Sequence, residues 1–152
     1  LELMLEIQRE EGMAIVLITH DLAVVAKMAD TVSVMYAGQV VEQGSVDDIF
    51  YRSAHPYTLG LKTAMPSADM QADAKLEAIP GSPPDLFAPP LGCAYCDRCP
   101  HAMNVCEGKN SDLIVVENMH RARCWLQKTG QAPSIAELYQ VDDSREGEVK
   151  YD

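Results

Sequence analysis

Apolar positions in the first twenty residues change from a helical spacing to an unbroken run. Residues 1–11 carry apolar side chains at the spacing of one helix face, and Gly12 follows as a C-cap residue would. Residues 14–18, Ala-Ile-Val-Leu-Ile, are then apolar without alternation, which is typical of a strand covered on both faces, most often in a parallel sheet. We therefore expect a helix over residues 1–11 and a buried strand over residues 14–19.

The pattern over residues 21–43 predicts a helix followed by a hairpin. Apolar residues recur at helical spacing over residues 22–29, where Asp21 can act as the N-cap. Strand patterns over residues 31–36 and 40–43 are separated by Ala-Gly-Gln, which is typical of a tight turn between antiparallel strands.

Two short helices are expected after the hairpin. Ser45 can cap a helix over residues 46–50, and Pro56 suits the first turn of another. Residues 1–64 together form a helix–strand–helix unit, a hairpin and two helices. This arrangement predicts the second half of an α/β domain rather than a complete one.

Composition divides the rest of the chain into three segments. Residues 65–90 are rich in proline and predict an extended linker. Residues 91–127 hold all five cysteines and form a candidate metal-binding module. Residues 128–152 form an acidic tail with the character of solvated coil.

Charge and chain length exclude some classes of partner. The net charge of −11 argues against nucleic acid and against anionic lipid as direct partners, because both need clustered Lys and Arg. No apolar run approaches the roughly 18 residues needed to span a bilayer. The chain begins at Leu1 within a helical pattern, and we therefore interpret it as a piece of a longer protein.

His20 stands where the expected buried strand ends. Ligands of parallel sheets bind beyond the carboxyl ends of the strands, where an imidazole can hydrogen-bond a phosphate oxygen or orient an attacking water. A lone histidine at a strand end can equally satisfy a backbone carbonyl, because one residue has no spacing to test. The chain contains no G-x-x-x-x-G-K-[ST] loop, so any phosphate cradle must come from elsewhere.

The spacing of the cysteines predicts a metal site. Cys93, Cys96 and Cys99 are separated by two residues each, and Cys106 and Cys124 follow after six and seventeen more. Such spacing lets a short loop wrap thiolates around one centre, as in zinc sites and ferredoxin-type clusters. Four thiolates suit either metal, and ordinary buried or reactive thiols are the remaining interpretation.

Other residues near these motifs have simpler interpretations. His101 and His120 lie near the cysteines, but four thiolates already complete a ligand set. His55 precedes a proline and is interpreted as the start of a helix. Trp125, beside Cys124, is expected to shield the metal centre from solvent.

Several segments together resemble one known family. Residues 18–22, Ile-Thr-His-Asp-Leu, resemble the switch-histidine segment of ABC-transporter ATPase subunits, and residues 34–44 resemble the hairpin that follows it there. Four further segments resemble features of the oligopeptide/dipeptide importer branch. They are His55-Pro56-Tyr57-Thr58, Ile79-Pro80-Gly81-Ser82-Pro83-Pro84, Gly92-Cys93, and Arg98-Cys99-Pro100 with the later Cys124.

This resemblance implies a fold and a role. The fold would be of the α/β class: the C-terminal half of a P-loop NTPase domain, followed by a small irregular cysteine-rich module. Two such subunits sandwich ATP and Mg²⁺ and drive membrane permease subunits, which receive peptides from an extracellular binding protein. The subunit would be peripheral, at the cytoplasmic face of the membrane.

The resemblance also assigns residues. His20 would contact the γ-phosphate and help position the hydrolytic water, in keeping with the electrostatic logic of phosphoryl transfer. In the family pattern the phosphate-binding loop, the signature segment and the Walker B carboxylates precede position 1. The chain alone is therefore expected to lack ATPase activity.

A metal centre is implied as well, because members of this branch carry a [4Fe–4S] cluster in this region. Its ligands would be Cys93, Cys99, Cys106 and Cys124, with Cys96 as a possible substitute and zinc as the alternative metal. The competing hypothesis is a non-catalytic metal-binding interaction or regulatory module derived from such a subunit.

Overall fold

The computed structural model describes residues 1–64 and 78–129. The first half of the expected linker and nearly all of the acidic tail lie outside the described residues. The elements in chain order are α1 (Glu2–Glu11), α2 (Leu22–Met28), β1 (Thr31–Tyr36), β2 (Gln39–Ser45), α3 (Val46–Tyr51), α4 (Pro56–Thr63), the 3₁₀ turn η1 (Cys96–Arg98), α5 (Asn104–Gly108), β3 (Ile114–Glu117), β4 (His120–Ala122) and α6 (Trp125–Lys128).

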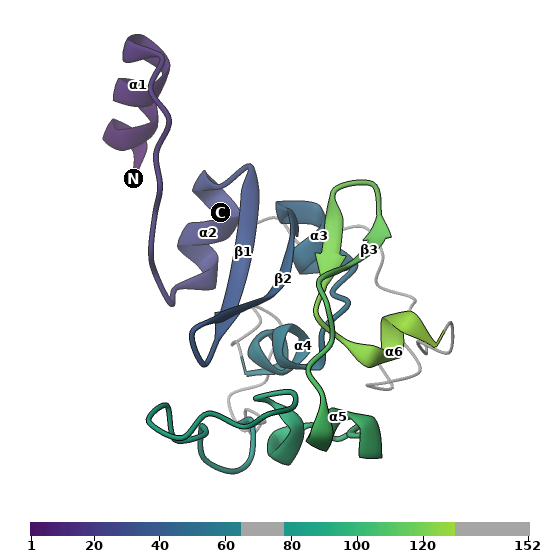
Figure 1. Cartoon of the computed structure of the whole chain (residues 1–152). Helices are drawn as coiled ribbons and strands as arrows, with labels where there is room; N and C mark the ends of the chain where they lie inside the picture. Colours follow the sequence, from purple (N-terminus) through teal and green to yellow (C-terminus); the bar gives the residue numbers. More distant parts are fainter. Residues whose placement is uncertain (65–77, 130–152) are drawn as a thin grey trace, which may run out of the picture.

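A four-stranded antiparallel sheet lies at the centre of the molecule (Figure 1). The strand order is β1-β2-β4-β3, and Glu42 and Gln43 of β2 lie opposite Ala122 and Arg121 of β4. A hairpin from the cysteine-rich end therefore extends the sheet begun by the hairpin of residues 31–45. The fold is a small mixed α/β arrangement in which the hairpin of residues 31–45 and the hairpin of residues 114–122 share one sheet.

The first hairpin forms as its sequence predicts. Ala37 and Gly38 have φ values of 48° and 76°, the left-handed backbone that a two-residue hairpin turn requires. The first strand has the expected bounds, and the second is longer than expected, since it runs from Gln39 to Ser45.

The predicted caps of the helices are confirmed. Asp21 Oδ1 accepts hydrogen bonds from two backbone amides at the start of α2, at 2.9 and 3.1 Å. Ser45 and Asp48 form a reciprocal capping box at the start of α3. Pro56 occupies the first turn of α4, and Gly12 ends α1 in the left-handed conformation.

The buried strand expected over residues 14–19 is absent, and this prediction is wrong for the structure. The segment belongs to no helix or strand, and the side chains of Val16 and Ile18 are 91% and 95% exposed. A strand that is apolar on both faces needs paired neighbours on both sides. In the described part of the chain every paired strand belongs to the β1–β4 sheet, and α1 with the segment after it stands apart from that sheet (Figure 1).

The core lies between the sheet, α3 and the segment that begins the cysteine-rich region. Its buried residues include Val34, Val41, Ile49, Phe50 and Tyr95. The Tyr95 ring makes edge contacts with two further tyrosines of the first 64 residues, each with centroids 5.4 Å apart. Aromatic packing therefore joins the cysteine-rich segment to the first hairpin and α4.

Arg98 adds polar contacts to the same junction. Its guanidinium donates to the carbonyls of Ile79 and Pro80 at 3.1 and 2.8 Å, and to the Tyr36 hydroxyl at 3.1 Å. One side chain thus ties residues 79–80 of the expected linker to β1 and η1.

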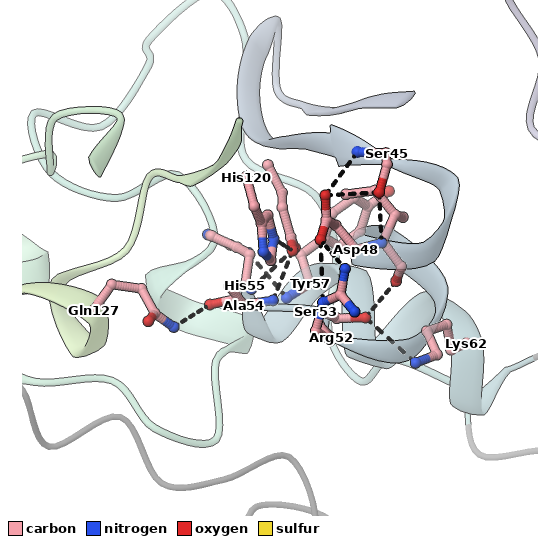
Figure 2. Close-up of polar contacts among 12 residues, drawn as sticks. Ser45, Asp48, Arg52, Ser53, Ala54, His55, Tyr57, Lys62, His120 and Gln127 are labelled. Carbon is pink, nitrogen blue, oxygen red and sulfur yellow. Dashed lines mark hydrogen bonds and ion pairs between the residues drawn. The ribbon is translucent and has the colours of Figure 1, made fainter. Parts of the chain in front are cut away.

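The carboxylate of Glu42 is completely buried, and both of its oxygens accept hydrogen bonds. Figure 2 shows Ala54, His55 and His120, the residues that donate to it. Oε1 accepts from the Ala54 amide at 2.6 Å and from His120 Nε2 at 2.8 Å, and Oε2 accepts from the His55 amide at 3.0 Å. Because these donors come from β4 and from the connection between α3 and α4, the carboxylate joins three separate segments.

Within the described residues, no helix has the length and apolarity required to cross a lipid bilayer.

We predict that Glu42→Gln lowers the free energy of unfolding by about 3 kcal/mol, because the amide has a single acceptor oxygen and its NH₂ group must face a buried donor. Chemical denaturation measures the change. The matched control is Glu117→Gln on β3, where the side chain is exposed and the stability is expected to change little. Equal stability of Glu42→Gln and the parent chain would show that the network contributes nothing to the fold.

Candidate functional site

His20 lies at the surface, one residue before the N-cap of α2. The Asp21 amide donates to Thr19 Oγ1 at 3.0 Å, which shapes the bend that carries His20. Because residues 14–19 form no strand, the crevice expected beyond a strand end is not assembled from the described residues. The structure thus positions His20 at the start of a helix without the rest of a nucleotide site.

The five cysteines converge on one hollow. The side chains that line it include those of all five, together with His55, His101 and Trp125. The cysteines come from three places: the turn and η1 at residues 93–99, helix α5, and the residue before α6. Folding therefore gathers thiols that are up to thirty-one positions apart in the sequence.

Backbone hydrogen bonds fix the loop that carries three of the thiols. The Cys93 amide donates to the Cys106 carbonyl at 2.7 Å, and the amides of Cys96 and Cys99 donate to the carbonyls three residues earlier at 2.9 and 3.1 Å. A Cβ at Gly92 would lie only 2.0 Å from the Cys106 carbonyl oxygen, so this approach requires glycine at position 92.

Burial favours the protonated form of four of these thiols in the absence of a metal. It raises the pKa of Cys99 to about 11 and that of Cys124 to about 12. Burial also raises the pKa of Cys93 and of Cys96. Since the thiolate is the ligand form, a metal would have to displace protons from these sulfurs on binding.

The donor set fits a thiolate-bound centre in number and chemistry. Five sulfurs in a largely apolar surrounding suit soft metals such as iron in clusters or zinc. Nevertheless, across residues 1–64 and 78–129, no three His, Cys, Asp or Glu side chains are grouped closely enough to hold one metal ion. The hollow therefore brings the donors together without closing them around a single ion.

His55 has a larger structural role than a simple helix start. Its Nδ1 accepts from the Tyr57 amide at 3.0 Å and so caps α4, and the ring lines the cysteine hollow. The side chain is 1% exposed. Burial lowers its pKa to about 4, and a hydrogen bond with the backbone of Arg123 opposes this shift only in part.

The remaining candidates are distributed between the hollow and the sheet. His101 lines the hollow, whereas His120 contacts Glu42 and is engaged in the sheet. Trp125 lines the hollow, and its indole Nε1 donates to the Lys109 carbonyl at 2.9 Å.

Sequence reasoning missed Glu42 and Arg123. Arg123 is the residue immediately before Cys124. Its side chain donates to the carbonyls of Val40 and Ser111 at 3.1 and 3.0 Å. A carboxylate among the apolar residues of the second strand was the available signal for Glu42. No local pattern indicated the partners of either residue, because they are far away in the sequence.

Comparison with known proteins finds similarity to peptide-transport proteins. Residues 41–106 match the family model described as oligopeptide/dipeptide transporter, C-terminal region. The dipeptide transport ATP-binding protein DppD of Bacillus subtilis is 49% identical over 127 residues, which cover 84% of this chain and 38% of that protein.

Two oligopeptide transport ATP-binding proteins named OppD are similarly related. That of Bacillus subtilis is 47% identical over 83% of this chain and 35% of its own length. That of Escherichia coli is 50% identical over 66% of this chain and 30% of its own length. The chain thus spans about a third of the length of the curated relatives it matches.

We predict that His55 stays neutral in the folded chain until the pH approaches 4, as followed by NMR of its imidazole. In the unfolded chain the group should titrate near 6.5, so the unfolded state binds the proton first and stability falls as the pH drops from about 6.5 towards 4. The chain in concentrated urea is the control. Titration near 6.5 in the folded chain would contradict the burial of this ring.

Proposed function

Because the chain belongs to the oligopeptide/dipeptide transporter family of ATP-binding proteins, we propose that it forms the C-terminal part of the ATP-hydrolysing subunit of a peptide importer. The observation that carries this proposal is the identity of 47–49% to two such proteins across more than four fifths of the chain. Binding of ATP and Mg²⁺ would use groups that precede residue 1 in the family pattern, with His20 contributing the γ-phosphate contact.

The exposed apolar surface of the first eighteen residues supports this proposal. Leu3 and Ile7 on α1 and Val16 and Ile18 after it are all exposed, although such side chains are normally covered. Nearly two thirds of each relative's length has no counterpart in the chain. In the family pattern the first part of the ATPase domain precedes this segment. We expect that part to cover α1 and to pair with residues 14–19 as a strand, which would bring His20 to the strand's carboxyl end.

The same proposal defines the partners and the location. A second ATPase subunit would complete the ATP sandwich, and transmembrane permease subunits would receive the energy of hydrolysis. A peptide-binding protein would act indirectly by delivering the peptide. The subunit would be peripheral, at the cytoplasmic face of the membrane.

For the cysteine hollow we propose a [4Fe–4S] cluster held by Cys93, Cys99, Cys106 and Cys124. Support comes from the convergence of thiols from three chain segments in one hollow. Such a centre would link the loop of residues 93–99 to α5 and to the end of β4.

The ATPase role is tested in a chimera in which this chain replaces the matching C-terminal segment of Bacillus subtilis DppD. We predict that the chimera hydrolyses ATP and that His20→Ala lowers its rate by a factor of about 100 or more, because the water and the γ-phosphate lose a positioning group. Steady-state phosphate release measures both rates.

The 152-residue chain alone is the negative control and should release no phosphate above background. Asp30→Ala in the chimera is the matched control, since this exposed side chain is near α2 but outside the proposed site. Undiminished hydrolysis by the His20→Ala chimera would refute the assigned role. Metal binding by a chimera that hydrolyses no ATP would favour the alternative of a non-catalytic regulatory module.

The metal proposal predicts about four iron atoms and four acid-labile sulfides per chain after purification without oxygen. Cys124→Ser should lower the iron and sulfide content per chain well below that of the parent chain, because one of four ligands is lost. Iron, sulfide and zinc analyses measure the load.

Cys96→Ser is the matched control and should keep the full iron load, since Cys96 is outside the proposed ligand set. A full load in Cys124→Ser would show that the ligand assignment is wrong. About one zinc without sulfide would show that the centre is a closed structural zinc site.

A further inference from the structure

The hollow holds one more thiol than a four-cysteine centre needs. Cys96 is this fifth thiol, and it lies in the loop between Cys93 and Cys99 with no disulfide to any cysteine. A role for Cys96 beside the centre rests on the metal-binding function proposed above. The question is which of its neighbours Cys96 can reach.

A tight turn brings Cys96 close to Cys93. The Cys96 amide donates to the Cys93 carbonyl at 2.9 Å, and Tyr95 at the third position has φ −90° and ψ −1°, the values of a type I turn. Such a turn keeps the first and fourth Cα atoms within about 7 Å. Disulfides span Cα separations of about 4.4–6.8 Å, so the turn brings the Cα atoms of this pair within reach of that range.

The turn is anchored in the core. Tyr95 is 3% exposed and its ring packs against those of Tyr36 and Tyr57. The Cys93 amide is also held by the Cys106 carbonyl. The two sulfurs are therefore carried by backbone that is already fixed, so little conformational entropy is lost when they bond.

Cys96 has a second turn partner in Cys99, whose amide donates to the Cys96 carbonyl at 3.1 Å. The turn that joins Cys93 to Cys96 has the shorter hydrogen bond, at 2.9 Å, and its first residue is held in addition by the Cys106 carbonyl. We therefore take Cys93 as the partner of Cys96, and a Cys96–Cys99 bond is an outcome that the test below distinguishes.

We propose that Cys93 and Cys96 form a dithiol–disulfide pair that competes with the metal centre for Cys93. The oxidant is a small disulfide such as oxidised glutathione. The Cys96 thiolate attacks one of its sulfurs and releases one glutathione, and Cys93 then attacks the Cys96 sulfur and releases the second. The protein thiols lose two electrons and two protons, and the small disulfide gains them as two thiols.

Oxidation of this pair removes one ligand from the centre. Cys99, Cys106 and Cys124 remain, and three thiolates do not complete the four-cysteine set of a [4Fe–4S] cluster. The ratio of small disulfide to small thiol would therefore decide whether the hollow holds a cluster or a disulfide.

The test uses the full chain, stripped of metal by a chelator and handled without oxygen. The chain is incubated with oxidised glutathione in excess over reduced, the remaining thiols are alkylated, and trypsin is added. Cleavage after Lys75 and Arg98 leaves Cys93 and Cys96 in one peptide, residues 76–98, and places Cys99 and Cys106 in the next, residues 99–109. We expect two of the five thiols to escape alkylation, with peptide 76–98 lighter by two hydrogen atoms.

Two serine variants make the assignment specific. Cys96→Ser should form no such light peptide and should still take up iron and sulfide after the oxidising treatment, whereas the parent chain should lose that capacity. Cys99→Ser is the matched control and should still form the light peptide. Because Cys99→Ser lacks one of the four proposed ligands, it also shows whether the disulfide forms in a chain that no longer loads iron.

A disulfide between peptide 76–98 and peptide 99–109 would overturn the proposed Cys93–Cys96 bond. Alkylation of all five thiols after oxidation would overturn it as well. The metal proposal fails separately: absence of iron from the reduced chain contradicts the cluster. Persistence of the light peptide in that case would support the Cys93–Cys96 pair alone. Iron uptake by the oxidised parent chain equal to that of the reduced chain would overturn the competition.

Discussion

The Glu42 carboxylate constrains how the parts of this chain fit together. A buried carboxylate is costly unless donors satisfy its oxygens, and the donors of Glu42 are 12, 13 and 78 positions away in the sequence. Any arrangement that separates β2 from β4, or from the connection between α3 and α4, leaves this charge without a partner. The network therefore selects one placement of the 114–122 hairpin against the first hairpin, beyond what apolar burial alone would specify.

The cysteine hollow depends on that placement. Cys124 follows Arg123 directly, and the Arg123 amide donates to the Val41 carbonyl at 2.7 Å. The loop of residues 93–99 is held from the other side, where Tyr95 packs in the core and Arg98 donates to Tyr36. Both sides of the hollow are thus anchored to the same sheet, and the thiols meet because the sheet joins the two hairpins.

Residues 1–20 show the opposite behaviour, since they stand apart from the sheet (Figure 1). The helix α1 forms because its hydrogen bonds are internal to the segment. A strand has no such internal bonds, and residues 14–19 lie unpaired although their apolar pattern is that of a buried strand. His20, beside this unpaired segment, is exposed as well.

By itself, the sequence determined the elements whose stabilising contacts are local. Asp21, Ser45 and Pro56 act within about four residues of their own positions, and the turn at Gly38 needs only its backbone conformation. It also indicated the family and the spacing of the first three cysteines. Only the tertiary structure decided that β2 pairs with β4, that His120 contacts Glu42, and that Cys106 and Cys124 join the other thiols. These contacts join residues far apart in the chain, and a local pattern carries no information about which distant groups will satisfy a buried charge or share a hollow.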